Sequence, residues 1–291
     1  MIYYDKDGVV PKTGLMDGIA SNVLQMGVVV NVAEPGRYPC SEVMSLPFIA
    51  PSSTIGSLVP WHLYNKYPVW GKDYPDDVII LSHFVSAAFQ IHTVDKPITS
   101  VDQLKGMKML AINDWALEVL KKVGAIPIYC HMWEVYENLS KGTAEGAICP
   151  LAPVKAMKVC EIAKYHTIVD LCYDCFTIPI NRGFFEGLPP DLQKLILDES
   201  GAKISEANGL ALDKGTELDC VFMKAEMGNS FHSLPEAEMA KFVNLALPLR
   251  DDWVSKMERK GLPARVILNE ALRYSQELTA QGKFIPEYPL D

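Results

Sequence analysis

The residue types best able to do chemistry in this chain are its cysteines and histidines. Seven cysteines are spread over 291 residues, an odd number in a large chain, which is not the pattern of a disulfide framework. Cys172 and Cys175 form a C-x-x-C, but their segment is predicted as a strand, where positions three apart face opposite sides and do not easily share a metal ion. We interpret the cysteines mostly as small buried apolar residues.

One enzyme hypothesis stays open, in which Cys149 or Cys130 is a nucleophile and His131 or His166 is its base. Cys130 and His131 are adjacent, and their side chains would point to opposite sides of an extended chain. Adjacency alone therefore does not pair a thiol with a base, and packing or pocket lining is the favoured interpretation of both residues. The histidines are scattered, so the sequence predicts no metal site.

Composition and longer motifs exclude several other classes. The sequence lacks G-x-G-x-x-G, G-x-x-x-x-G-K-[ST], H-E-x-x-H and G-x-S-x-G, which removes the best support for nucleotide-binding, zinc-protease and α/β-hydrolase activity. We expect no cofactor. The net charge of -9 would repel a phosphate backbone, so nucleic acid is not an expected partner. Residues 1–5 lack the basic start and apolar run of a signal peptide.

The elements that must position any site follow an α/β pattern. Short apolar runs alternate with amphipathic stretches, and five runs are predicted as strands: Val28–Val32, Val78–Leu81, Met107–Ile112, Ile126–Cys130 and Cys175–Ile180. In the clearest unit, Ser100 caps a short helix, Asn113 or Asp114 caps the next helix, and Gly124 closes it. This unit predicts a βαβ crossover in a parallel sheet.

A helical pattern also runs from Pro189 and Pro190 towards Met223. Over about 35 residues it would be on the order of 50 Å long, wider than one lobe of about 140 residues. We favour one bent helix along two lobes over pieces separated at glycines such as Gly201. Any two lobes would share strands that cross between them more than once.

Seven groups of segments, in order, are similar to motifs of one family. They are Pro35–Pro39; Ser41–Val43 with Leu46–Phe48; Gln90–Thr93 with Lys96–Pro97; Asp102–Lys108; Gly124–Ala125 with Glu134–Tyr136; Gly142 with Glu145–Gly146 and Pro150; and Asn181–Arg182 with Leu188–Gln193. Together they resemble the solute-binding proteins of tripartite ATP-independent periplasmic (TRAP) transporters over nearly the whole chain. That family is typified by dicarboxylate-binding and sialic-acid-binding proteins.

The resemblance implies a two-lobed periplasmic-binding-protein-like α/β fold with crossing hinge strands and a long helix along both lobes. We place lobe I at residues 1–87 plus 175–213 and lobe II at residues 88–174 plus 214–291. The implied function is periplasmic capture of a small organic ligand in the cleft between the lobes, and its delivery to integral-membrane transporter subunits. Such a protein needs no catalytic group, since closure around the ligand excludes water and strengthens a few polar contacts.

Three positions depart from the family pattern. Where the family usually has an Arg that pairs with the ligand carboxylate, this chain has Leu110; where it often has an Asn, this chain has Cys149; and Met132 replaces an aromatic residue. Guanidinium is suited to bidentate pairing with carboxylate, so its loss puts an apolar surface in place of a charge. Core packing is the competing interpretation of each of these three residues.

Two ligand hypotheses follow. In the favoured one the ligand is uncharged or aromatic at that end, because a buried anion without a positive partner costs several kcal/mol. Its contacts would come from Leu110, Met132, Cys149 and Tyr173 or Trp115, with hydrogen bonds from Gln90, Asn113 and Asp170. In the second an organic acid pairs elsewhere, and the candidates are Arg37, Lys96, His131 and Arg182.

The resemblance also implies a first strand and helix, roughly 30 to 40 residues, ahead of the segment that Ile2–Tyr4 resembles. This unit and the export signal are missing from the sequence, which predicts truncation. A ligand-binding module that feeds a sensor domain and a relic that no longer binds ligand are the remaining alternatives.

Overall fold

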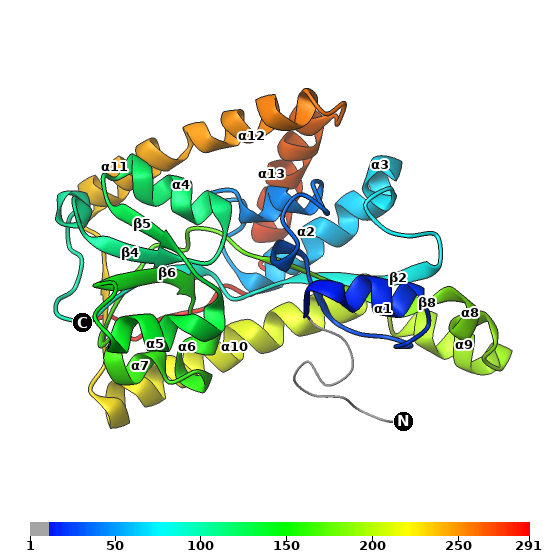
Figure 1. The fold of residues 1–291 in the computed structure, drawn as a ribbon, viewed down its shortest axis with the longest axis horizontal. Helices are drawn as coiled ribbons and strands as arrows, with labels where there is room; N and C mark the ends of the chain where they lie inside the picture. Colours follow the sequence, from blue (N-terminus) through cyan, green and yellow to red (C-terminus); the bar gives the residue numbers. More distant parts are fainter. Residues whose placement is uncertain (1–11) are drawn as a thin grey trace.

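The computed structural model describes residues 12–291, so the predictions for the first eleven residues lie outside the described part. Two β-sheets form the centres of two lobes joined side by side (Figure 1). The mixed α/β, two-lobed architecture predicted from the sequence is confirmed.

The first lobe is built on a three-stranded antiparallel sheet of order β1-β8-β2. The strands are β1 (Val29–Val30), β2 (Val78–Val85) and β8 (Cys175–Asn181). The accompanying helices are α1 (Leu15–Ala20), α2 (Ser53–Lys66), α3 (Pro68–Gly71), α8 (Arg182–Glu186) and α9 (Pro190–Asp198), with short 3-10 turns at Lys12–Gly14, Asn31–Ala33 and Ser41–Ser45.

The second lobe is built on a six-stranded mixed sheet of order β5-β4-β6-β3-β7-β9. The strands are β3 (Phe89–Thr93), β4 (Lys108–Ala111), β5 (Ile126–Tyr129), β6 (Gly146–Pro150), β7 (Tyr165–Ile168) and β9 (Ser230–Ser233). The helices are α4 (Asp114–Lys122), α5 (Val135–Ser140), α6 (Ala152–Ala156) and α7 (Val159–Ile162), with 3-10 turns at Val101–Leu104 and Met132–Glu134.

The predicted crossover unit is present. β4 and β5 are parallel and α4 connects them. Asn113 caps α4 by accepting a hydrogen bond from the backbone N–H of Ala116 at 2.8 Å. Gly124 ends the unit with φ +81°, a left-handed conformation that glycine adopts without strain.

Two extended segments cross between the sheets and pair with each other. Residues 86–88 connect β2 to β3, and residues 169–174 connect β7 to β8. The backbone N–H of Ser86 donates to the carbonyl of Asp174 at 2.9 Å, and that of Phe89 donates to the carbonyl of Cys172 at 3.0 Å. Cys172 therefore lies in a crossing segment and Cys175 begins β8, so the prediction of one strand through both cysteines is wrong. We call residues 86–88 and 169–174 the hinge segments.

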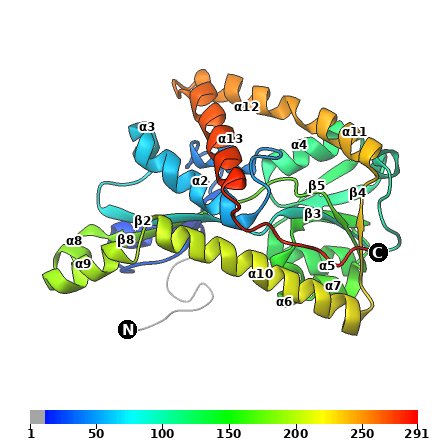
Figure 2. The ribbon, with the colours of Figure 1, turned by 180° about the vertical axis from the view of Figure 1, so that it is seen from behind.

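The long helix crosses both lobes, but the prediction of one bent helix from residue 190 is wrong. Gly201, with φ +70°, separates α9 from the 26-residue α10 (Ala202–Met227). At 1.5 Å per residue α10 is about 39 Å long. It packs on α2 and β2 in the first lobe and on α6 and α7 in the second, and Figures 1 and 2 show it running below both sheets.

Three C-terminal helices cover the opposite side: α11 (Glu236–Ala246), α12 (Pro248–Glu258) and α13 (Ala264–Ala280). α11 and α12 contact α4 of the second lobe, whereas α13 packs on α2 of the first. The residue boundaries of the lobes stay a prediction. Among residues 12–291, none of the helices combines the length and the apolar character needed to cross a lipid bilayer.

Candidate functional site

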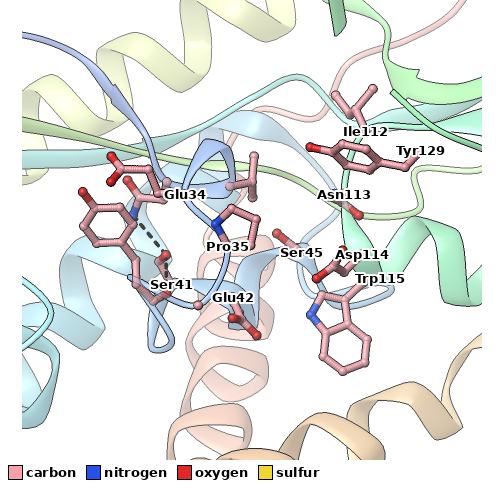
Figure 3. A pocket seen from close by; sticks show the side chains of 14 residues that line it. Glu34, Pro35, Ser41, Glu42, Ser45, Ile112, Asn113, Asp114, Trp115 and Tyr129 are labelled. Atoms are coloured by element: carbon pink, nitrogen blue, oxygen red, sulfur yellow. Dashed lines mark hydrogen bonds between the residues drawn. The ribbon is translucent and has the colours of Figure 1, made fainter. Parts of the chain in front are cut away.

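A recess lies between the lobes, where loops after β1 face the ends of β4 and β5 (Figure 3). Its volume is about 50 Å³, which is room for a few water-sized groups. We call it the interlobe recess. The first lobe contributes Asn31, Val32, Glu34, Pro35, Gly36, Tyr38, Ser41, Glu42 and Ser45, and the second contributes Ile112, Asn113, Asp114, Trp115 and Tyr129.

The lining residues come from chain segments just beyond strand ends. Asn31 follows β1, Asn113 and Asp114 follow β4 closely, and Tyr129 ends β5. Residues at such positions are oriented by the sheet while their side chains stay free of the sheet's own packing. In the close-up, Glu34, Pro35 and Ser41 lie on one side, and Ile112, Asn113 and Tyr129 on the other (Figure 3).

The first-lobe wall carries a paired glutamate. Glu34 Oε2 accepts a hydrogen bond from Arg37 at 2.5 Å, and the same guanidinium pairs with Asp17 at 2.5 Å. These two carboxylates raise the pKa of Arg37 well above its usual range, and the hydrogen bond from Arg37 lowers that of Asp17. Arg37 is thus neutralised by two acids beside the recess.

Glu42 and Asp114 belong to opposite lobes, and Figure 3 shows both near the indole of Trp115. Burial is the largest influence on the Glu42 carboxyl and raises its pKa, and the nearby charge of Asp114 raises it further. The charges of Lys256 and Lys260 and a hydrogen bond with Trp115 act in the opposite direction and lower it. The Lys256 ammonium is 4.0 Å from Glu42 Oε2 and 5.7 Å from the centre of the Trp115 ring. Glu42 therefore has a lysine ammonium beside it, and Lys256 does not belong to the recess lining.

A buried carboxyl group joins the recess to the hinge. Asn113 Nδ2 donates to Asp174 Oδ1 at 2.8 Å, and the backbone N–H of Asp174 donates to Ser86 Oγ at 3.0 Å. Asp174 is 3% exposed, and burial raises its pKa to about 7, although the Asn113 hydrogen bond lowers it. Asn113 is thus positioned both by its helix cap and by a hinge carboxyl.

Leu110 and Cys149 do not line the interlobe recess. Both are fully buried in an apolar cluster beneath the second lobe's sheet, and Met132 packs at the edge of that cluster. Along β4, Leu110 faces this cluster while Met109 and Ala111 face the main core, as strand alternation requires. The ligand contacts expected of Leu110, Cys149 and Met132 stay a prediction.

The predicted hydrogen-bonding residues divide in two. Asn113 lines the recess, together with the predicted aromatic contact Trp115. Gln90 on β3 binds a hinge residue: its Nε2 donates to Asp170 Oδ1 at 2.6 Å. Asp170 also lines a separate groove beside α13. Tyr173 is fully buried in the main core, and its hydroxyl has no hydrogen-bond partner among residues 12–291.

The four candidates for a relocated positive partner are engaged or distant. Besides the paired Arg37, Arg182 donates to the backbone carbonyls of Asp76 and Val78 at 2.7 and 3.2 Å. His131 stacks on Trp133 with ring centres 4.4 Å apart. Lys96 is exposed beyond the outer end of β3. None of the four belongs to the recess lining.

The thiols of the enzyme hypothesis are in environments that suppress reactivity. Burial raises the pKa of Cys130 to about 11 and that of Cys149 further above its usual range. A nucleophilic cysteine needs the opposite shift. His166 Nδ1 is 2.8 Å from His92 Nδ1, and its Nε2 is 2.7 Å from Asn229 Oδ1, so both of its ring nitrogens are occupied.

Sequence reasoning missed most of the recess. It did not propose Asn31, Glu34, Tyr38, Glu42, Ser45 or Tyr129 as site residues, and it considered Asp114 only as a helix cap. The signal that could have found several of them is their place just after a strand, combined with acidic and aromatic side chains in a loop.

The sequence profile of the family described as bacterial extracellular solute-binding protein, family 7, matches residues 3–256. Among characterised relatives, the C4-dicarboxylate-binding periplasmic protein DctP of Rhodobacter capsulatus is 26% identical over 182 residues, which are 62% of this chain. The match spans only 54% of that relative's length.

Solved structures agree over more of the chain. A TRAP solute-binding protein from Rhodoferax ferrireducens, in complex with copurified benzoate, superposes with a TM-score of 0.85 at 27% identity, covering 93% of this chain and 84% of the other. A TRAP periplasmic solute-binding protein from Desulfovibrio salexigens gives 0.84 at 26% identity, covering 97% and 86%.

Proposed function

The chain belongs to family 7 of the bacterial extracellular solute-binding proteins, and from that premise we propose that it captures a small organic solute between its lobes for a TRAP-type transporter. The observation that carries the proposal is the interlobe recess, which takes its lining from both lobes and lies beside two hinge segments. A ligand that contacts both walls favours the closed arrangement because it binds that arrangement better.

The expected place of action is the periplasm, and the expected partners are the integral-membrane subunits that receive the solute. We propose no enzymatic step. The raised pKa values of Cys130 and Cys149 and the occupied nitrogens of His166 support this reading.

For the ligand we propose a molecule that is not held by a carboxylate clamp. Leu110 occupies the position at which the family resemblance implies an Arg, and Arg37 is already paired with two acids. Asn113 and Trp115 are the proposed contacts from the second lobe. Leu110, Met132 and Cys149 would shape that wall from beneath, and Gln90, Asp170 and Tyr173 would hold the hinge.

A thermal-shift screen combined with small-angle X-ray scattering tests this function. A ligand at 100 times its Kd adds about 2.7 kcal/mol to the free energy of unfolding, so the midpoint should rise by a few degrees. A true ligand should also reduce the radius of gyration as the lobes close. If a broad panel of small organic compounds raises no midpoint and changes no scattering curve, solute capture is contradicted.

A further inference from the structure

Four polar atoms of the interlobe recess are buried without a hydrogen-bond partner among residues 12–291. They are Glu34 Oε1, Tyr38 OH, Glu42 Oε2 and Ser45 Oγ. Tyr38 and Ser45 are each 2% exposed, and Figure 3 shows Ser45 in the gap between Pro35 and Asp114. Buried polar groups in folded proteins are normally satisfied, so this concentration in one recess points to a ligand.

The chemistry of these atoms specifies what they need. An ionised carboxylate only accepts hydrogen bonds, whereas a hydroxyl can donate or accept. Glu34 already accepts from Arg37 through Oε2, and Glu42 Oε2 has the Lys256 ammonium at 4.0 Å, so the atoms that still need a hydrogen-bond donor are Glu34 Oε1 and Glu42 Oε2. Tyr38 and Ser45 are compatible with donors. A ligand rich in N–H groups can satisfy all four atoms, but a ligand carboxylate can use only the two hydroxyls.

Charge favours the same kind of ligand. The charged residues among the described lining are Glu34, Glu42 and Asp114, and all are acidic. Glu42 and Asp114 approach from opposite lobes and repel each other, and the Lys256 ammonium, 4.0 Å from Glu42 Oε2, is one cation for two carboxylates. A bound cation would turn this repulsion into an attraction that joins the lobes.

The aromatic lining fits a cation as well. Tyr38, Trp115 and Tyr129 line the recess, and cations are attracted to the faces of such rings. The Lys256 ammonium already lies 5.7 Å from the Trp115 ring centre at the edge of the recess. This contact shows that the indole can take an ammonium group as a neighbour.

We propose that the solute carries an ammonium or similar N–H-rich cationic group, which binds between Glu42 and Asp114 against Trp115. This inference rests on the proposed function and specifies its ligand class. The matching features are two acid groups from opposite lobes, unpartnered buried acceptors and an aromatic wall.

The first test compares compounds of matched shape and different charge. Isothermal titration calorimetry and thermal shift would be run on the intact protein with sets such as benzylamine, benzyl alcohol and benzoate, and with a broader panel built in the same way. We expect the amine of a set to bind at least about tenfold tighter than its alcohol, as a charge-assisted hydrogen bond allows. The acid should not bind measurably.

The second test removes the charges. Glu42→Gln and Asp114→Asn keep the side-chain shape, and each should weaken amine binding by about tenfold or more while leaving alcohol binding little changed. Asp191→Asn is the matched control, because Asp191 is also an exposed acid in the first turn of a helix, in α9 and outside the recess. The unfolding midpoints without ligand show whether each variant is folded.

The outcomes separate this inference from the function beneath it. If acids or neutral compounds bind and their amine counterparts do not, solute capture stands and the cationic ligand class is overturned. The same holds if amines bind equally well to both recess variants and to the control. If no compound of any charge binds, the proposed function fails and this inference fails with it.

Discussion

At the scale of single residues, the buried carboxyl group of Asp174 in the hinge should make the stability of the protein depend on pH. The carboxyl group is 3% exposed and accepts a hydrogen bond from Asn113 at 2.8 Å. Burial raises its pKa from 3.8 to about 7, although the Asn113 hydrogen bond lowers it. Because the folded-state pKa lies above the unfolded one, the native protein is favoured at low pH. That advantage is lost as the pH rises from about 4 through 7.

Asp174→Asn should therefore stabilise the protein more at pH 8 than at pH 5. The amide can still accept from Asn113, but it does not ionise. The gain in unfolding free energy should be about 3 kcal/mol larger at pH 8 than at pH 5. Urea unfolding of both proteins at the two pH values measures it. Asp251→Asn, at an exposed acid on α12, is the control, and an equal gain at both pH values would contradict a raised pKa.

The sequence predicted site residues correctly only where their position depends on neighbouring residues in the chain. Asn113 was found because a helix cap is read from adjacent residues, and the structure places it in the recess. Leu110 was expected at the cleft; strand alternation places its side chain in the apolar cluster of the second lobe, and its contact with a ligand stays a prediction. Glu42 and Asp114 are far apart in the sequence and come together because the two lobes meet. The residues around each of them therefore give no sign that the two carboxylates share one recess.

At the scale of elements, the crossing of α10 over the start of α2 fixes the long helix to the first lobe. Asp213 on α10 accepts hydrogen bonds from the backbone N–H groups of Ser53 and Thr54 at 2.9 and 2.7 Å. These are free donors at the start of α2, which a carboxylate satisfies well. One turn earlier, Gly209 lets the two backbones approach, since a Cβ there would lie against Ser53 O and 2.7 Å from Thr54 Cα.

Two glycines of the same helix should thus respond oppositely to alanine. Gly209→Ala should destabilise the protein by about 1–3 kcal/mol, because the added methyl meets backbone that cannot easily move. Gly215→Ala should stabilise it by about 0.5–1 kcal/mol, because no atom lies within 4 Å of its Cβ and alanine is the better helix former. Thermal unfolding of the pair tests this, and equal effects at both sites would refute the close crossing.

The elements themselves were largely predictable, and their ends less so. All five predicted strands are present, four of them as largely buried apolar runs and β5 as a partly exposed one, whereas β3, β6, β7 and β9 were not predicted. The break at Gly201 was missed, since a helical apolar pattern continues on both sides of it. What stops the helix is tertiary: the backbone N–H of Gly201 donates to the carbonyl of Leu81 at 2.7 Å, which ties the chain to β2.

At the scale of the whole molecule, net charge and recess charge act in the same direction. The chain carries a formal charge of -9, and the charged residues in the described recess lining are acidic. The summed field of such a protein attracts cations and repels anions over roughly a Debye length, about 10 Å at 0.1 M salt. A cationic solute would be steered towards the recess before any contact forms.

This steering predicts a distinct salt dependence of association. Between about 20 and 500 mM salt, the association rate constant of an amine ligand should fall roughly two- to tenfold, while that of its alcohol counterpart stays nearly constant. Stopped-flow tryptophan fluorescence can follow both, because Trp115 lines the recess. In Glu42→Gln the slope for the amine should be shallower, since one carboxylate contributing to the local field is gone. An amine rate that rises with salt would mean that the field at the recess is positive, whatever the net charge of the chain.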